Sequence, residues 1–243
     1  MHLPTIPSTV AATVLAVSTA VLTPMPAFAG ELGGAGESGS PYPDGYVEPL
    51  SFWSGPYAGI TIGYGWGEAT QTYIRAGDHG TTSISPSGGL GALTFGYNVH
   101  TSQGILLGLE GDLGLMDMSA GPETVFDGHI YSADFGPFWG TARARAGAML
   151  GQALVYGTAG LAFMDIDERS IGNTPGETAL SNEFRAGWVI GAGAELAVGQ
   201  RTSLKVEVLH MDLGTVDGFS QNNEPFRFEE TANVLRTGIS YKF

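Results

Sequence analysis

Hydrophobic and polar residues alternate with a period of two in eight segments of about ten residues, and the first follows Phe52. Successive side chains of a β-strand point to opposite faces, so this period predicts strands rather than helices. The predicted strands cover residues 56–67, 90–99, 105–115, 138–150, 153–164, 185–197, 203–211 and 232–243. The chain is therefore expected to be all-β.

The connections between these segments alternate strictly in length. Those over residues 100–104, 151–152 and 198–202 are short, whereas those over 68–89, 117–137, 165–184 and 212–231 are long and polar. A transmembrane barrel has this arrangement, with short turns on the periplasmic side and long loops outside. We predict an eight-stranded antiparallel up-and-down transmembrane β-barrel over residues 52–243.

Each predicted strand gathers its charged residues on one face. In strand 185–197, Trp188, Ile190 and Leu196 share one face, and Glu195 lies on the other among glycines. The charged faces together carry four acids and four bases: Glu110, Asp112, Arg143, Arg145, Glu195, Lys205, Glu207 and Arg236. Such balance is expected of charges enclosed together, because an unpaired buried charge costs several kcal/mol. We predict that these eight residues form a charge network in the lumen.

Two further features fit this orientation. Symmetric pairing about Gln200 sets Glu195 opposite Lys205, and glycines on the inner faces make room for large neighbours in a narrow barrel. Aromatic residues lie where the two girdles of a membrane barrel are expected. They are Tyr64, Trp66, Tyr97, Trp188, Tyr241 and Phe243.

The net charge and the cysteine content exclude several kinds of partner and site. The formal net charge is −14, which makes nucleic acid an unsuitable partner because the phosphate backbone is also negative. The chain has no cysteine, which excludes disulfides and thiolate metal sites.

The N-terminal region is typical of a secreted precursor. Residues 10–22 are apolar, and Ala27 and Ala29 supply a cleavage pattern of small residues, so residues 1–29 are predicted to be a signal peptide. The usual Lys or Arg near the start is missing, so the true start codon and the cleavage site stay open. Residues 30–51, rich in Gly, Pro and Ser, are predicted to be a flexible leader.

Several motifs, taken in order, resemble a known family. They are Trp53-Ser54-Gly55-Pro56-Tyr57-Ala58-Gly59, Gly63-Tyr64-Gly65-Trp66-Gly67, Gly108-Leu109-Glu110-Gly111-Asp112, the segments at 140–147, 156–162, 187–195 and 205–207, and the terminal 236–243. The chain resembles the small porin-like outer-membrane barrels called outer-membrane immunogenic proteins, a branch of the OmpA-like barrels.

This resemblance implies location in the bacterial outer membrane. It also implies that Ile239, Tyr241 and Phe243 form the signal read by the barrel-assembly machinery. Because the last strand reaches the final residue, we expect no peptidoglycan-binding domain after it. The sequence departs from the family in the smooth stripe of alanines at 142, 144, 146 and 148, which could contact another protein or simply face lipid.

The sequence contains few candidate catalytic or metal-binding residues. His210 with Asp212, and Asp127, His129 and Ser132 in the second long connection, could orient a base, but no motif fixes a nucleophile. The run at 165–168 could bind a divalent cation, although we favour a solvated acidic surface. The glycine clusters lie inside strands and precede no helix, so they are not phosphate loops. We predict no catalytic residue, no cofactor and no metal site.

The leading functional hypothesis is structural. The protein would contribute to envelope integrity, contact outer-membrane lipid and lipopolysaccharide, and display acidic loops, with a packed lumen rather than an open pore. The alternatives are a surface adhesin or receptor for a host or phage ligand, a narrow porin, and a soluble lipocalin-like carrier.

Overall fold

A computed structural model of the chain describes residues 52–75, 78–101, 104–124, 129–171, 178–220, 223 and 225–243. The predicted signal peptide and leader, with Ala27 and Ala29, lie outside the described residues. Within the described part, no helix is long and apolar enough to cross a membrane.

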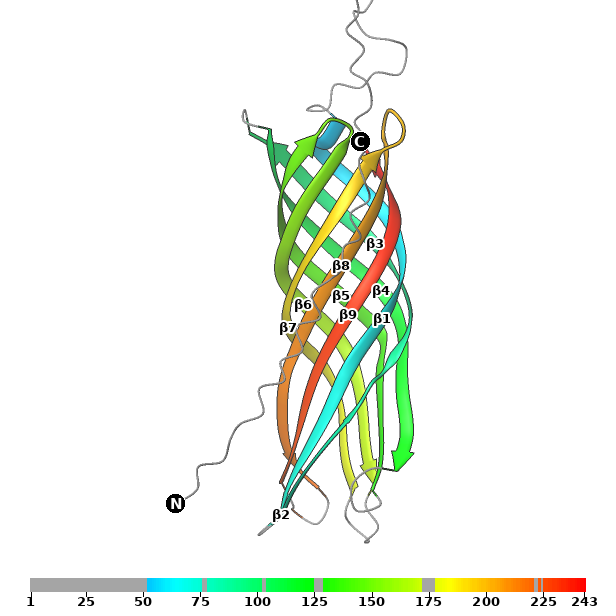
Figure 1. Ribbon diagram of the computed structural model, residues 1–243, viewed down its shortest axis with the longest axis vertical. Helices are drawn as coiled ribbons and strands as arrows, with labels where there is room; N and C mark the ends of the chain where they lie inside the picture. Colours follow the sequence, from blue (N-terminus) through cyan, green and yellow to red (C-terminus); the bar gives the residue numbers. More distant parts are fainter. Residues whose placement is uncertain are drawn as a thin grey trace, which may run out of the picture. The chain divides into compact units, whose positions relative to one another are not determined.

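The described residues form one antiparallel sheet that closes on itself (Figure 1). Its strands are β1 (Gly55–Arg75), β2 (Asp78–Ile84), β3 (Ser87–His100), β4 (Ile105–Thr124), β5 (Ile130–Leu150), β6 (Ala153–Ile171), β7 (Thr178–Ala197), β8 (Thr202–Phe219) and β9 (Pro225–Lys242). Each strand from β3 onward pairs with the next in sequence, and β9 pairs with β1 from Tyr57↔Lys242 to Tyr73↔Phe226. The predicted antiparallel up-and-down barrel is confirmed.

The ninth strand comes from an interruption and does not change the topology. Both β2 and β3 pair with β1, and only Ser85 and Pro86 separate them. Proline has no backbone N–H to donate to a ladder, so a strand tends to break there. The Pro86 carbonyl still accepts a 2.8 Å hydrogen bond from the Gly67 amide, so the two pieces act as one interrupted second strand.

The strands are much longer than the sequence pattern predicted. Seven of them have 18 to 21 residues, whereas about 9–11 residues suffice to cross a membrane. The additional residues all lie at the end away from the short turns, and they fill most of the four segments expected to be long loops. That expectation was wrong because these extensions carry polar residues outside, so the pattern of a lipid-facing strand disappears there.

At the end away from the short turns, the barrel wall divides into two four-stranded sheets. Pairing between β7 and β8 stops at Trp188↔Asp212, and pairing between β3 and β4 stops at Ser87↔Ser119. Strands β4 to β7 stay paired beyond these points, as do β8, β9, β1 and β2. We call these two groups the β4–β7 lobe and the β8–β2 lobe. Figure 1 shows them ending in separate groups at the bottom of the view.

The outer wall of the short-turn half is apolar. Leu109 and Leu113, for example, are 68% and 70% exposed. The six predicted girdle aromatics are also exposed, at 43–68%. This wall suits contact with acyl chains.

Inner glycines make room for large side chains, as expected. A Cβ on Gly96 would lie 2.2 Å from the ring of Tyr57, and one on Gly193 would lie 2.5 Å from the Tyr156 hydroxyl. Both tyrosines are buried inside the barrel. A side chain at either glycine would therefore displace a tyrosine that bonds the charged interior.

Candidate functional site

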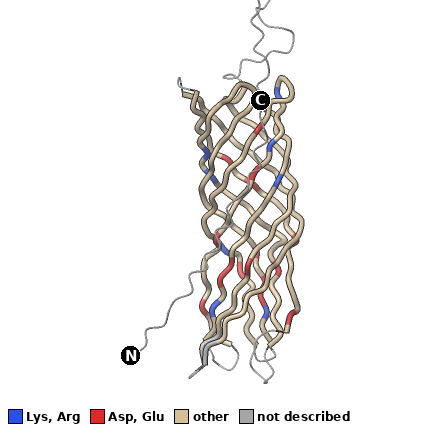
Figure 2. Tube along the Cα trace, viewed as in Figure 1, with Lys and Arg blue, Asp and Glu red and all other residues tan. Residues whose placement is uncertain are grey.

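The eight charged residues predicted to share one environment all lie inside the barrel. None is more than 4% exposed. They come from β4, β5, β7, β8 and β9, and they meet in the half of the barrel that has the short turns. Figure 2 shows charged residues in this part of the tube and, after an interval with few charges, again toward the other end.

Glu110 on β4 is one centre of this network. Lys205 Nζ lies 3.0 and 2.9 Å from its two carboxylate oxygens, and Tyr57 donates to Oε2 at 2.6 Å. Arg143 Nη2 donates to Oε1, and Arg145 Nη1 lies 3.4 Å from Oε2. One carboxylate thus connects side chains from three other strands.

Asp112 and Glu207 form a second centre with the guanidinium groups of Arg143 and Arg236. Arg236 Nε donates to Glu207 at 2.7 Å, and its Nη2 donates to Asp112 at 3.0 Å. Arg143 Nη1 bonds Glu207 at 3.0 Å, and its Nη2 bonds Asp112 at 2.8 Å. Thr141 adds a 2.7 Å bond to Asp112, so the buried carboxylates have several donors each.

The predicted register of Glu195 and Lys205 is confirmed, since the two are directly opposite on β7 and β8. Their strongest contacts nevertheless go elsewhere. Glu195 accepts from Arg145 at 2.6 Å and from Lys242 at 3.3 Å, and Lys205 bonds Glu110. Inside a narrow barrel, a side chain reaches the opposite wall as easily as its neighbour on the next strand.

Sequence reasoning missed four buried charges. Lys242 lies on the same face of β9 as Arg236, so the alternation alone could have found it. Arg185, Glu168 and Glu230 lie in or beside segments predicted to be loops, where no strand phase was assigned. With these four, the described interior holds six acids and six bases.

The other three missed residues, Arg185, Glu168 and Glu230, form a second, smaller cluster toward the end away from the short turns. Arg185 Nη2 donates to Glu168 at 2.9 Å, and its Nη1 bonds Glu230. Tyr131 donates to Glu168 at 2.6 Å, and Ser181 accepts from Arg185 at 3.0 Å. Because Glu168 and Arg185 belong to the β4–β7 lobe and Glu230 to the β8–β2 lobe, this cluster joins the two lobes.

An apolar layer separates the two charged clusters. The buried residues of β9 show the sequence of layers, in the order Phe226, Phe228, Glu230, Ala232, Val234, Arg236, Ser240 and Lys242. Buried side chains from the other strands surround Ala232 and Val234 at this level, including Met116, Met118, Phe135, Trp139, Met164, Val189, Leu209 and Met211. The interior is therefore layered and not uniformly ionic as the sequence suggested.

A short N-terminal turn lies against the short-turn end of the interior. Trp53 is fully buried and Phe52 nearly so, and they pack with Leu106, Leu154 and Tyr156. The Trp53 carbonyl accepts a 3.0 Å bond from Asn98, and Lys242 Nζ lies 5.1 Å from the Trp53 ring centre. Apolar packing thus closes the charged network at its short-turn end.

Comparison with known proteins agrees with a closed antiparallel sheet that has an apolar outer wall. Residues 46–243 match the family model described as outer membrane protein beta-barrel domain. The chain belongs to this family of outer-membrane barrels. The protein therefore lies in the bacterial outer membrane, and its short-turn end is the periplasmic one.

Two relatives are similar to this outer-membrane barrel over most of their length. The 31 kDa outer-membrane immunogenic protein of Brucella melitensis is 30% identical over 203 residues, which cover 79% of this chain and 84% of the relative. The 25 kDa outer-membrane immunogenic protein of Brucella abortus is 29% identical, with 81% and 82% covered. The resemblance to the immunogenic proteins is confirmed.

A solved structure supports the fold. The outer membrane protein OprG from Pseudomonas aeruginosa superposes with a TM-score of 0.51 at 15% identity, covering 78% of this chain and 97% of OprG. At this identity the likeness concerns the fold alone.

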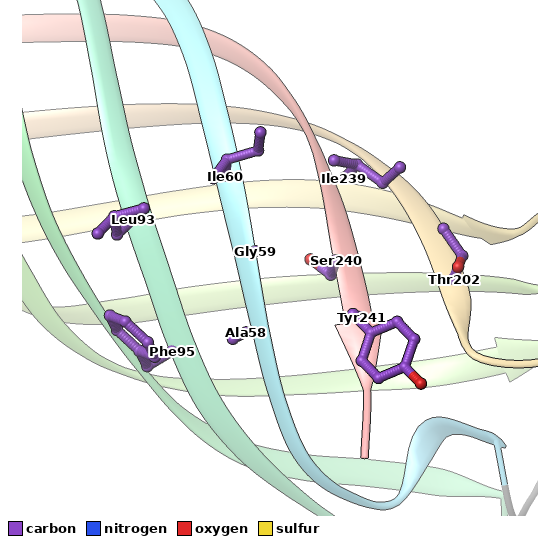
Figure 3. A pocket seen from close by; sticks show the side chains of 9 residues that line it. All are labelled: Ala58, Gly59, Ile60, Leu93, Phe95, Thr202, Ile239, Ser240 and Tyr241. Atoms are coloured by element: carbon purple, nitrogen blue, oxygen red, sulfur yellow. The ribbon is translucent and has the colours of Figure 1, made fainter.

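The outer wall of this barrel has a shallow hollow near its periplasmic end (Figure 3). Ala58 and Gly59 form its floor, and the larger Leu93, Phe95 and Tyr241 rise around them. A second hollow has Ala144, Ala146, Gly157 and Ala159 among its lining residues, so the predicted alanine stripe does lie on the outer wall.

The three residues of the predicted assembly signal are exposed, Ile239 and Tyr241 on the outer face of β9 and Phe243 directly after its last residue. Ile239 is 44%, Tyr241 45% and Phe243 68% exposed, and the Tyr241 and Phe243 rings meet edge to face at 5.4 Å. The Phe243 amide bonds the Pro56 carbonyl at 3.1 Å, which fixes the end of the chain against β1.

The two candidate catalytic residues at the end of β8, His210 and Asp212, have different hydrogen-bond partners. His210 Nδ1 lies 2.9 Å from Asn233 Oδ1, whereas Asp212 accepts a bond from the Gly214 amide. Asp127 lies outside the described residues, so its relation to His129 and Ser132 stays a prediction.

The acidic run at 165–168 is divided by its strand. Glu168 is buried and bonded to Arg185, whereas Asp165 and Asp167 are half-buried and exposed, respectively. Among the described residues, no group of three or more Asp, Glu or His side chains could hold a metal ion. The four residues therefore do not form the oxygen-ligand site that their spacing allowed.

Proposed function

We propose that this barrel is a closed structural protein of the outer membrane that contributes to envelope integrity and conducts no large solute. The filled interior carries the proposal. Two charged clusters, the apolar layer between them and the Phe52–Trp53 turn occupy successive levels of one narrow barrel. An eight-stranded barrel has an interior just wide enough for side chains to fill.

Conductance tests the closed barrel. The purified full chain is inserted into planar bilayers, and correct folding is checked by heat-modifiable gel migration. We expect no stable conductance in molar salt. A reproducible large conductance from correctly folded protein contradicts the proposal and favours the porin alternative.

Envelope integrity needs a cellular test. A strain that lacks the gene should become more permeable to a dye that the outer membrane excludes, and the wild-type gene should restore the barrier. Unchanged permeability in the deletion strain contradicts the structural role. Lipopolysaccharide is the proposed neighbour of the outer wall, and the barrel-assembly machinery is the proposed partner of Ile239, Tyr241 and Phe243.

The proposed role involves no catalysis. His210 is bonded to Asn233 and lies beside the Trp188 ring at 5.5 Å, so its described contacts are those of an interfacial side chain. We expect the His210→Ala protein to complement every phenotype of the deletion strain. Loss of complementation by a folded His210→Ala protein would argue for chemistry at this rim.

A surface-recognition role is the second candidate. Strands β5 to β9 extend well beyond Trp66 and Trp188 and carry exposed acids such as Asp134, Asp167 and Glu229. Residues above the outer girdle are not required to span the membrane. Binding of host cells or phage that is lost when these extensions are shortened, with the barrel still folded, would favour recognition.

A further inference from the structure

The division of the wall leaves unpaired strand edges at both of its seams, between β3 and β4 and between β7 and β8, and the two edges at the β7–β8 seam are the longer stretches of one continuous strand each. The pairing of β7 with β8 covers Trp188–Ala197, so the edge of β7 over Thr178–Gly187 forms no ladder with a second strand in the described part of the chain, although β8 still lies against Gly187. The edge of β8 over Leu213–Phe219 is in the same position. Such edges present unpaired N–H and C=O groups to which another extended chain can bond.

We propose that the free edge of β7 over Thr178–Gly187 binds an extended, basic polypeptide segment by strand addition. This goes beyond the closed-barrel role, because it places a binding surface on the outside of the cell at a defined strand. If the test of this binding surface fails, the proposed closed lumen is not affected.

The regularity of β7 makes it the better of the two edges. Its pairing with β6 runs without a break from Ala153↔Leu196 to Ile171↔Thr178, so the backbone is held as a straight ladder. On β8 the register shifts between Asp212 and Thr215, and Gly214 has a positive φ of 77°. A bulge of this kind bends a strand and interrupts the regular spacing of its donors and acceptors.

The side chains of the β7 edge indicate the chemistry of the partner. Leu180 and Phe184 are 59% and 63% exposed, and the Phe184 ring stacks on Phe163 at 6.3 Å. They lie in the strand extension, where such apolar surface is available to an alternating partner strand. Cross-strand apolar pairs stabilise an added strand.

Charge decides between a foreign peptide and a second copy of the chain. Acids outnumber bases beside the edge: Glu183 on β7 and Asp167 on β6 are exposed and Asp212 is half-buried across the division, whereas Arg169, opposite Leu180, is the exposed base. Two copies pairing through β7 would bring these acids together, whereas a basic segment would be attracted. The partner is therefore a segment that alternates apolar and basic residues.

The test uses the full chain in neutral detergent micelles and a ten-residue peptide of alternating Lys and Val. Hydrogen exchange is followed by mass spectrometry. In the free protein we expect rapid exchange of those amides of Thr178–Gly187 that point away from β6. The peptide should slow exchange in this segment, and a version with two Val replaced by Pro should not, because proline removes the backbone donors.

Glu183→Lys should weaken binding of the peptide by about tenfold, measured by fluorescence anisotropy. Glu68→Lys is the matched control, since it makes the same charge change on an exposed residue of β1, which pairs with β9 at Thr231. It should leave the affinity within about twofold.

Three results would overturn the proposal. One is binding that both lysine variants weaken equally, which would be general attraction to an acidic surface. Another is protection of Thr178–Gly187 in the free monomer, which would mean that the chain covers its own edge. The third is protection that follows protein concentration without peptide, which would assign the edge to a second copy.

Discussion

Glu110 illustrates how a single residue holds this barrel together. It bonds Tyr57 on β1, Arg143 and Arg145 on β5, and Lys205 on β8, and none of these groups is exposed. A buried ion pair adds modest net stability when complete, but it is costly to break because the partner charge remains in the interior. The network is thus sensitive to loss of one member.

Glu110→Gln should lower the free energy of unfolding in urea by about 3–5 kcal/mol, because Lys205 and the arginines lose a charged acceptor. The double variant Glu110→Gln/Lys205→Met should lose less than the two single losses added together, with a coupling of at least about 1 kcal/mol. Glu68→Gln, an exposed acid, serves as control and should have little effect. Additive losses in the double variant would show that the two groups do not interact.

Two exposed acids of the strand extensions should respond to pH with opposite sign. Partial burial, with Asp167 opposite and Asp117 nearby, raises the pKa of Asp134. Its folded pKa is above the unfolded value, so the ionised Asp134 carboxylate lowers the stability of the barrel at higher pH. This loss of stability disappears as the pH falls and the carboxyl becomes protonated. The hydrogen bond from Arg227 lowers the pKa of Asp217, whose contribution is present at neutral pH and lost as the pH falls.

Asp134→Asn should therefore raise the stability at pH 7 by at most about 0.5 kcal/mol, since water screens exposed charges. Asp217→Asn should lower it. Both differences from wild type should shrink as the pH falls toward the pKa of each carboxyl, measured as thermal midpoints across a pH series. The same sign for both variants would contradict this account.

At the scale of elements, the length of the strands separates what the sequence could predict from what it could not. The lipid-facing alternation located all eight membrane-crossing strands, because a strand with one face in lipid has to be apolar at every second position. It could not locate the extensions, in which Glu168 and Glu230 point inward while Asp167 and Glu229 are exposed. Because both faces of the extensions mix polar and apolar residues, the alternation carries no signal there.

The two lobes depend on Arg185, which bonds Glu168 in its own lobe and Glu230 in the other. Arg185→Met should leave two buried carboxylates facing each other and loosen the lobes. We expect faster hydrogen exchange in the extensions of β5 and β9 at the end away from the short turns. Exchange in the periplasmic half should be unchanged.

Glu168→Gln/Glu230→Gln combined with Arg185→Met should restore much of the protection, because it removes the stranded charges. If Arg185→Met alone left exchange in the extensions unchanged, the cluster would not join the lobes.

For the whole molecule, closure of β1 against β9 brings the first and last strands of the barrel together, and the exposed Phe243, directly after β9, bonds Pro56 on β1. Phe243→Ala should lower the amount of assembled barrel in the outer membrane several-fold while leaving urea stability of the refolded protein within about 0.5 kcal/mol, as for most surface changes. Fractionation and heat-modifiable migration measure the first effect. Equal loss in cells and in refolded protein would mean that Phe243 is a packing residue.

The sequence by itself determined the barrel class, the membrane-crossing strands, the outward aromatics and the eight charges of the periplasmic network. Local alternation sets all of these, since each residue's face follows from its neighbours along the strand. Only the tertiary structure decided which charge bonds which, as Lys205 meets Glu110 across the lumen rather than Glu195 beside it. It also decided the apolar layer, the second charged cluster and the division into lobes. These depend on distances between opposite walls, which no pattern along a single strand records.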